Sequence, residues 1–481
     1  MRARIAAQIF APENRKWWTL GAVTFGLFMI MLDNTVVNVA LPSIQRDLDM
    51  KLSELEWIVS GYALTFAALM LIGGKLADAY GRRLIFVIGI AVFTLASLAC
   101  GLASTGEVLI AARVAQGVGA AMMNPATLSI IAVTFPPRER GTAIGIWAGV
   151  SALALAIGPL VGGLLTEHAG WNWIFFINVP VGILGIFASF VLIDESRDES
   201  HERLDLPGLF TSGIGLFALT YGLIEANNYG WGSTRIVGAF VVAAVALVSF
   251  VLLERHTRAP MLDLTLFRNR TYVGANLVML LVALAMFGVF FFVSLYMQNV
   301  LGYSAVQAGA AFLPMTLLII VVAPLAGRAS DRFGSRWLMT TGMVLLAAQL
   351  AYFSQLSADS TFWRMLPALV LGGFGMAMTM TPSSAAAMRA VPVAKAGMGS
   401  AVLNAFRQVG GSTGIALMGA IMASRLTTPP TPASFMDGFE RALLVASGIA
   451  LAGAIVAAIL VRPHDRSHGA EESAPAVAEA A

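Results

Sequence analysis

The feature that most constrains this chain is a series of apolar runs, each long enough to cross a lipid bilayer as a helix. About 20 residues at 1.5 Å each span roughly 30 Å of hydrocarbon. Only 12% of the residues are charged, too few for a soluble protein of this length, so a lipid-exposed surface is expected. The runs between polar breaks predict fourteen spans, at 18–41, 55–78, 83–104, 107–133, 141–166, 173–194, 206–227, 235–254, 272–298, 304–327, 337–355, 364–387, 396–424 and 438–461.

The placement of basic residues supports an even number of spans. Cytoplasmic connections of membrane proteins carry an excess of Lys and Arg. With the N-terminus inside, the predicted cytoplasmic segments and adjoining span ends hold most of the 30 basic residues. We therefore expect a multi-pass protein of the plasma (inner) membrane with both termini in the cytoplasm. Residues 1–17 form a polar cytoplasmic segment without a cleavable signal peptide, and 462–481 a disordered cytoplasmic tail.

Composition also limits the chemistry. The net charge is only +3 without a basic stripe, so nucleic acid is not an expected partner. The five histidines lack metal-ligand spacing, and the single cysteine, Cys100, cannot form an intrachain disulfide. No G-x-x-x-x-G-K-[ST] phosphate loop is present. We expect no cofactor and no metal, a proton gradient as the energy source, and a small-molecule substrate, protons and the lipid bilayer as partners. The oligomeric state stays open, a monomer being allowed, as does any periplasmic adaptor.

A repeated turn predicts the architecture. GKLADAYGRR (74–83) follows the second span and GRASDRFGSR (327–336) follows the tenth, and both read G-x-x-x-D-x-x-G-x-R. The copies lie eight spans apart, although a six-helix repeat would place them six apart. The simplest solution is two six-helix halves, 18–194 and 272–461, with two inserted central helices at 206–254. Transporters are commonly built from such repeats, with the site between the halves.

The residues of this turn suit a gate. Glycine allows close helix approach, and Asp78 at a helix end can pair with Arg82 or Arg83. Such a pair can hold one end of a bundle closed in one state and release it in another. The alternative is an ordinary charged connection that obeys the charge rule. The predicted gating residues are Gly74, Asp78, Gly81, Arg82, Arg83, Gly327, Asp331, Gly334 and Arg336.

These turns resemble the signature loop of the major facilitator superfamily. The fourth span, LIAARVAQGVGAA (109–121), is similar to the arginine-bearing helix of that family. The fifth, GIWAGVSALALAIGPLVGG (145–163), resembles its antiporter motif, although Ala154 stands where the motif usually has glycine. The resemblance covers about residues 18–461. It implies an all-α membrane protein of major-facilitator type, a bundle of two six-helix halves plus two inserted central helices.

Other segments resemble the fourteen-span drug:proton antiporter branch of the EmrB/QacA type. They are LDNTVVNVALP, WNWIFFINVPVG, LDLTLFRNRTY and NAFRQVGGSTG, with Asn172 where the branch commonly has arginine. The branch resemblance implies a secondary active transporter for multidrug efflux, and hence antibiotic resistance. It would export small lipophilic or cationic drug-like compounds in exchange for protons.

Asp33 is the only acidic residue well inside a predicted span. A carboxylate there is a functional hypothesis by default. Spans one and four run in opposite directions and place Asp33 and Arg113 at a similar depth, so the two could interact. We expect Asp33, with Arg113, to handle the coupling proton, because burial favours a neutral carboxyl and a nearby cation favours an ionised one. The alternative is a packing residue bonded to Asn34, Asn38 or a backbone group.

Two further sets of residues are predicted to take part. Gly158, Pro159, Gly162 and Gly163 make span five a candidate hinge, with plain helix packing as the alternative. The pocket would hold polar side chains and part of a Met- and Phe-rich cluster in span nine, which suits bulky lipophilic substrates. For Arg407, pairing with backbone carbonyls is the alternative. The polar pocket candidates are Asn34, Asn38, Gln116, Arg407 and Gln408, and the cluster is Met286, Phe287, Phe290, Phe291 and Phe292.

Several other functions compete with drug efflux. A dedicated metabolite or antibiotic exporter and a nutrient importer fit the same fold. A sensor that binds without translocating would usually show an additional soluble domain or a degraded gating loop, and both loops are intact. An enzyme is not expected, because a lone Asp33 is inadequate for catalysis within the membrane.

Overall fold

The computed structural model describes residues 12–197, 205–257, 260, 262–392, 396–427 and 431–462. The predicted N-terminal segment is described only from residue 12, and there it already belongs to the first helix. The predicted tail lies outside the described residues, apart from residue 462.

The described chain is helical throughout and contains no strand. The elements are α2 (Pro12–Asp47), α3 (Leu52–Tyr80), α4 (Arg82–Gly101), α5 (Gly106–Thr134), α6 (Pro137–His168), α7 (Trp173–Phe176), α8 (Asn178–Leu192), α9 (Leu206–Tyr229), α10 (Thr234–His256), the 3-10 helix η1 (Leu264–Arg268), α11 (Arg270–Leu295), the π-helix η2 (Tyr296–Val300), α12 (Ala305–Ala311), α13 (Leu313–Phe333), α14 (Ser335–Phe353), α15 (Phe362–Arg389), α16 (Ala396–Ala423) and α17 (Pro432–Leu460).

Each predicted span coincides with one helix or with consecutive helices. Among the described residues, ten helical segments are long and apolar enough to cross a membrane, and twelve if α3 and α6, which both bend, each count as one span. Helices α14 and α16 are not among these segments. The all-helical membrane bundle is therefore confirmed, whereas the count of fourteen spans stays a prediction.

Exposed apolar side chains mark the surface that faces lipid. Helix α8 exposes Ile183 and Phe187, and helix α10 exposes Val241, Val245 and Val248. Such continuous apolar faces are rare on proteins that face water. A helix satisfies its backbone groups internally and can therefore present these faces to hydrocarbon.

The second glycine of each repeated turn ends one helix and begins the next. Gly81 lies between α3 and α4 at φ 125°, and Gly334 lies between α13 and α14 at φ 86°. Both angles belong to the region that side chains with a Cβ avoid. The backbone N–H of Gly81 donates to the carbonyl of Ala77, and that of Gly334 to Ser330, which satisfies the last turn of each helix. The repeat thus encodes the same reversal twice.

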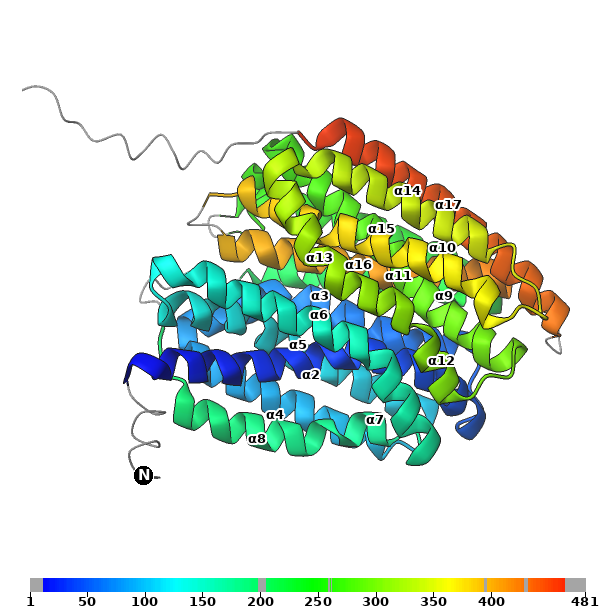
Figure 1. The fold of residues 1–481 in the computed structure, drawn as a ribbon, viewed down its shortest axis with the longest axis horizontal. Coiled ribbons are helices and arrows are strands. Elements are labelled where there is room, and N and C mark those ends of the chain that lie inside the picture. The colour runs from blue at the N-terminus through cyan, green and yellow to red at the C-terminus, as the bar shows by residue number, and fades with distance from the viewer. Residues whose placement is uncertain are drawn as a thin grey trace, which may run out of the picture.

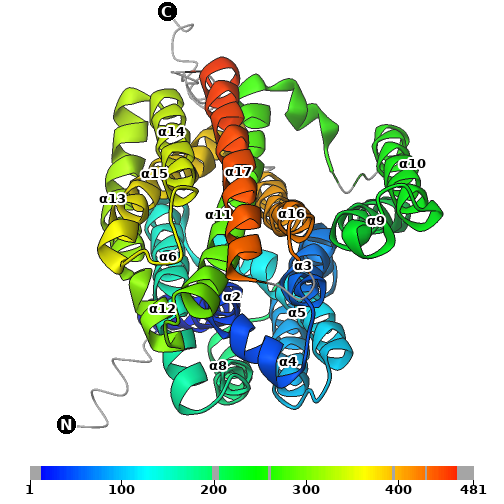
Figure 2. The ribbon, with the colours of Figure 1, turned by 90° about the vertical axis from the view of Figure 1, so that its right-hand side faces the viewer.

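The helices pack in two groups, and a few pairs of helices join one group to the other. Within the first, α2 packs on α6 and α5 packs on both α3 and α4; within the second, α11 packs on α16 and α15 packs on both α13 and α14. The groups meet where α3 contacts α16 and where α6 contacts α12 and α13. Helices α9 and α10 pack on each other to one side, and α9 contacts α3 and α16 (Figure 2). The division into two six-helix halves and an inserted pair stays a prediction, which these contacts fit.

The described chain begins and ends at the same end of the bundle, where α2 starts and α17 finishes (Figure 1). We call this the terminal end and the opposite one the distal end. Both repeated turns lie at the terminal end, and the short helix α12 lies at the distal end.

Candidate functional site

Asp33 on α2 and Arg113 on α5 form an ion pair inside the bundle. Arg113 Nη1 donates to Asp33 Oδ2 over 2.5 Å, and both residues are 1% exposed. Arg113 Nε donates to the carbonyl of Ile58 over 3.1 Å, and the guanidinium lies 4.2 Å from the ring centroid of Tyr62. Charges this deep are tolerated when they are paired and hydrogen-bonded. The structure therefore brings together the two residues that the sequence placed at equal depth.

Gln116 completes the partners of this pair. It lies three residues after Arg113 on the same face of α5. Its Nε2 donates to Asp33 Oδ1 over 3.1 Å and to Ser97 Oγ over 2.8 Å, and its Oε1 accepts from Arg113 over 2.6 Å. Gln116 was predicted to line the pocket and instead belongs to this network. The side-chain amides of Asn34 and Asn38 donate to backbone carbonyls of α2 and not to Asp33.

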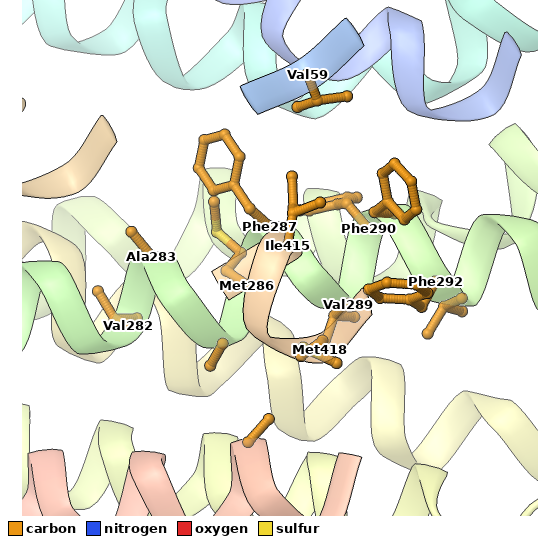
Figure 3. Packing of buried hydrophobic residues seen from close by; sticks show 14 of the residues in the cluster. Val59, Val282, Ala283, Met286, Phe287, Val289, Phe290, Phe292, Ile415 and Met418 are labelled. Atoms are coloured by element: carbon orange, nitrogen blue, oxygen red, sulfur yellow. The ribbon is translucent and has the colours of Figure 1, made fainter. Parts of the chain in front are cut away.

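A narrow cleft of about 10 Å³, room for about one water molecule, lies between the two groups of helices, beside the ion pair. It brings together Asn34, Asn38, Arg407 and Gln408, four of the five predicted polar pocket residues. Phe287 and Phe290 lie on the side of α11 that faces Val59 of α3 (Figure 3). From the predicted aromatic cluster, Phe291 and Phe292 do not line the cleft and instead pack edge to face with each other. The lining residues are Met31, Asn34, Thr35, Asn38, Leu155, Met286, Phe287, Phe290, Arg407 and Gln408.

The polar groups of this cleft are largely without partners among the described residues. Arg407 Nε has no hydrogen-bond partner, and its Nη2 donates to the sulfur of Met31 over a long 3.9 Å. Gln408 is fully buried, yet neither its Nε2 nor its Oε1 has a partner. Asn38 Oδ1 is also unpartnered. Because buried polar groups in folded proteins are nearly always hydrogen-bonded, these atoms are available to a solute or to water.

The two repeated turns are locked by different partners. In the first, Arg82 Nε donates to Asp78 Oδ1 over 2.8 Å, as one of the predicted pairings required. Arg83 instead contacts Glu195, whose carboxylate accepts from the backbone N–H of Arg83. In the second, Asp331 pairs with Arg389 of α15 over 2.8 Å.

The other predicted residues of the turns lie at matching positions. A Cβ at Gly74 would lie 3.4 Å from Pro125 of α5, and one at Gly327 would lie 3.4 Å from Thr381 of α15. Arg336 is placed over the ring of Trp337, with 5.4 Å between guanidinium and centroid, and its Nε has no partner among the described residues. The first glycines of the two copies thus face equivalent neighbouring helices, at a distance that would be ordinary contact for a Cβ.

The predicted hinge of α6 is in backbone contact with two other helices. A Cβ at Gly158 would fall 1.9 Å from Thr35 Oγ1 of α2, and one at Gly162 would fall 2.6 Å from the carbonyl oxygen of Val36. A Cβ at Gly163 would fall 2.4 Å from the carbonyl oxygen of Ala305 on α12. None of these positions has room for a side chain. We call this contact, with Gly309 of α12 against Pro159, the distal seam.

The two halves of α6 are packed unequally. The helix bends by 40° between 142–155 and 157–168, just before Gly158 and Pro159. Beyond the bend the glycines of the distal seam have no room for a Cβ, whereas Gly145 and Gly149 before it are exposed, with nothing within 4 Å of a built Cβ. A pocket of about 300 Å³ lies beside the seam at the distal end, and its lining includes Thr166, Glu167 and Ala305.

The structure adds a buried acid that the sequence did not single out. Glu56 of α3 is 2% exposed, and its Oε2 has no partner among the described residues. It lies against Gly419 of α16, where a Cβ would fall 1.9 Å from Oε1. Glu225 of α9 lies close enough to repel it and accepts a hydrogen bond from Trp57. Asp33 is therefore not the only deeply buried carboxyl of the spans, and Glu56 was overlooked because it stands next to a predicted span boundary.

Comparisons with known proteins agree on one family. The model of the Major Facilitator Superfamily matches residues 23–415 and 275–480. The chain is 39% identical over 415 residues to the tetracenomycin C resistance and export protein of Streptomyces glaucescens, covering 86% of this chain and 77% of that protein. It is 38% identical over 477 residues to the puromycin resistance protein pur8 of Streptomyces alboniger, covering 97% and 95%.

One further relative and one solved structure extend this comparison. The multidrug resistance protein Stp of Mycobacterium tuberculosis H37Rv is 38% identical over 417 residues, which are 86% of this chain and 77% of that protein. The fold resembles the crystal structure of a bacterial homolog of the human lysosomal transporter Spinster, inward-facing and unoccupied. That likeness has a TM-score of 0.65 at 18% identity and covers 94% of this chain and 98% of that one.

Proposed function

Because this chain belongs to the major facilitator superfamily, it is a multi-pass membrane transporter and not an enzyme, and we propose that it exports small lipophilic, drug-like compounds in exchange for protons. In this proposal both termini lie in the cytoplasm, so the terminal end is the inner end. Three relatives are named for resistance to tetracenomycin C, to puromycin and to several drugs, which supports export as the direction.

The observation that carries the proposal is the position of the ion pair beside the cleft. Asp33 contacts α5 from one side of α2, and four residues of the cleft wall, at 31, 34, 35 and 38, lie on the same helix. A proton on Asp33 removes the partner of Arg113 and leaves that cation buried without a counter-charge. Helix α2 must then repack against α5, and the cleft wall moves with it. Proton binding and solute binding thereby act on one helix.

The direction in this proposal rests on the relatives that are named for resistance and export. In this conformation the distal seam holds α6 against α12 at the outer end. A solute would reach the cleft from the cytoplasm and leave when the seam opens. We leave cations out of this proposal, because Arg407 is the one charged residue among the described residues that line the cleft.

The test is transport in everted membrane vesicles with an imposed proton gradient. Asp33→Asn keeps the shape of the side chain and removes its charge and its exchangeable proton. We expect gradient-driven uptake of a lipophilic drug panel to fall to background, while solute exchange without a gradient persists. Asp437→Asn is the control, because the side chain of Asp437 is half-exposed and lies outside the cleft. Undiminished, gradient-dependent uptake by Asp33→Asn would refute the coupling role.

A dedicated exporter of one antibiotic or metabolite is the second candidate. Two relatives are named for single compounds, tetracenomycin C and puromycin, which favours a narrow substrate range. The same vesicles distinguish the candidates. Uptake of many unrelated panel members indicates multidrug efflux, and uptake of one scaffold indicates a dedicated exporter.

A further inference from the structure

The charge of the central cleft points to a class of solute. Among the residues that line it, Arg407 is charged and none is acidic. Asp33 is close in sequence to the lining residues, but its carboxylate is engaged by Arg113 and Gln116 and does not line the cleft. The cleft therefore holds one positive charge that no described side chain balances.

A half-buried cation without an ion-pair partner is less stable than a paired one. Burying a charge is unfavourable unless it is paired and hydrogen-bonded. Arg407 has a free Nε donor, and the neighbouring Gln408 has a free amide donor at Nε2. Guanidinium and amide donors together match the paired oxygens of a carboxylate, or the single oxygen of a phenolate or enolate. These two residues form an incomplete anion site.

The rest of the lining suits the body of such a molecule. Phe287 and Phe290 present rings on one face of α11 (Figure 3), and Met31 and Met286 add thioethers. Aromatic rings and polarisable sulfur pack well on flat aromatic solutes. Asn38 Oδ1 and Gln408 Oε1 are unpartnered acceptors and can take hydroxyl donors of the same solute.

We propose that the central cleft, once it widens beyond the narrow space of this conformation, binds an aromatic molecule that carries an anionic oxygen group, with the anion on Arg407 and Gln408 and the ring system against Met31, Met286, Phe287 and Phe290. The statement that this molecule is the exported solute rests on the proposed function. The preference of the cleft for an anion is independent of that function. The assignment narrows the solute from any lipophile to an organic acid with a flat ring system.

The sign of the solute charge sets the energetics of the exchange. An anion that leaves as one proton enters moves two elementary charges in the same direction. A neutral solute moves one, and a monovalent cation moves none. With the cytoplasm negative, the membrane potential therefore drives both halves of anion export. Transport of the anion should accordingly depend on the potential more steeply than transport of a neutral analogue.

The experiment uses three fluorescent probes with one ring system: anthracene-2-carboxylate, its carboxamide and 2-(aminomethyl)anthracene. Binding to the purified full-length protein is measured in detergent without any gradient. A charge-assisted hydrogen bond is worth about 1.5–3 kcal/mol, so we expect the carboxylate to bind at least about tenfold more tightly than the ammonium. Tighter or equal binding of the ammonium by the unaltered protein overturns the proposal.

Substitutions at Arg407 test whether this residue causes the preference for the carboxylate over the ammonium. Arg407→Gln should abolish that preference. Arg407→Lys should keep it with weaker binding, because lysine retains the charge without the guanidinium fork. Arg425→Gln is the control, an exposed arginine just beyond α16. An unchanged preference in Arg407→Gln refutes the site. If Arg407→Gln does not fold, two other measurements test the anion site. Gln408→Leu should weaken binding of the carboxylate, and the carboxylate should raise the melting temperature of the unaltered protein more than the ammonium does.

Failure of this inference and failure of the proposed function are separable. Binding in detergent needs no proton gradient, so a non-coupled protein can still show the anion preference. If the carboxylate binds but vesicles do not pump it, the site stands and export is wrong. If drugs are pumped but the ammonium binds better, export stands and the anion site is wrong.

Discussion

Arg113 on α5 and Arg407 on α16 are both arginines inside predicted spans, and each contacts α2. Arg113 donates to Asp33, to Gln116 and to the carbonyl of Ile58. Arg407 has an unpartnered Nε and a long contact to the sulfur of Met31. The protein itself neutralises Arg113 through Asp33, whereas Arg407 has no acidic partner among the described residues. The comparison separates a charge that holds the bundle together from a charge that awaits a ligand.

The largest expected effect comes from removing the paired cation. Arg113→Leu leaves Asp33 buried without its counter-charge, and such a loss typically costs about 3–5 kcal/mol. We expect lower yield and a markedly lower melting temperature of the purified protein. Asp33→Asn combined with Arg113→Leu should recover much of the loss, because no uncompensated charge remains. A double variant as unstable as Arg113→Leu would show that the arginine acts through packing alone.

The next largest effect on stability is expected at the glutamine near each arginine, Gln116 near Arg113 and Gln408 beside Arg407. Gln116→Leu removes hydrogen bonds to Asp33 and Ser97 and strands their partners, so we expect a loss of about 1–3 kcal/mol in the free energy of unfolding. Gln408→Leu removes an amide that has no partner and should cost less than Gln116→Leu, or even stabilise. Thermal unfolding of the two variants side by side measures the difference. Equal losses would mean that Gln408 is bonded in the folded protein.

The smallest effect on stability is expected at the unpaired cation. Arg407→Leu replaces a half-buried, unpaired charge with an apolar side chain, so the free energy of unfolding should change by no more than about 1 kcal/mol, with stabilisation favoured. The same change that disrupts Arg113 should thus leave the fold intact here while it removes anion binding. A loss of unfolding free energy as large as that of Arg113→Leu would show that Arg407 has a structural partner. The contrast between the two arginines would then be wrong.

The sequence anticipated the features that depend on length and depth. Apolar runs of span length became helices because a bilayer demands that length. Asp33 and Arg113 met because two antiparallel helices brought equal depths together. Gly81 and Gly334 took the positive φ angles that a repeated turn requires.

Features that depend on helix rotation and tertiary neighbours were not predictable. The direction in which Gln116 points is set by the face that α5 turns to α2, and a single position does not encode it. Asp331 forms its ion pair with Arg389 because α15 packs on α13, although Arg336 is nearer to Asp331 in the sequence. Glu56 is buried by Gly419 of a distant helix, which span hydropathy cannot reveal.

The distal seam has a consequence for how readily the transporter can change state. Many of its contacts place a glycine against a backbone carbonyl, as Gly162 meets Val36 and Gly163 meets Ala305. The hydrophobic penalty of separating two surfaces scales with the apolar area that becomes wet, and bare backbone offers little of it. The open and closed forms can therefore lie close in free energy. In such a protein a single binding event is enough to reverse which form predominates.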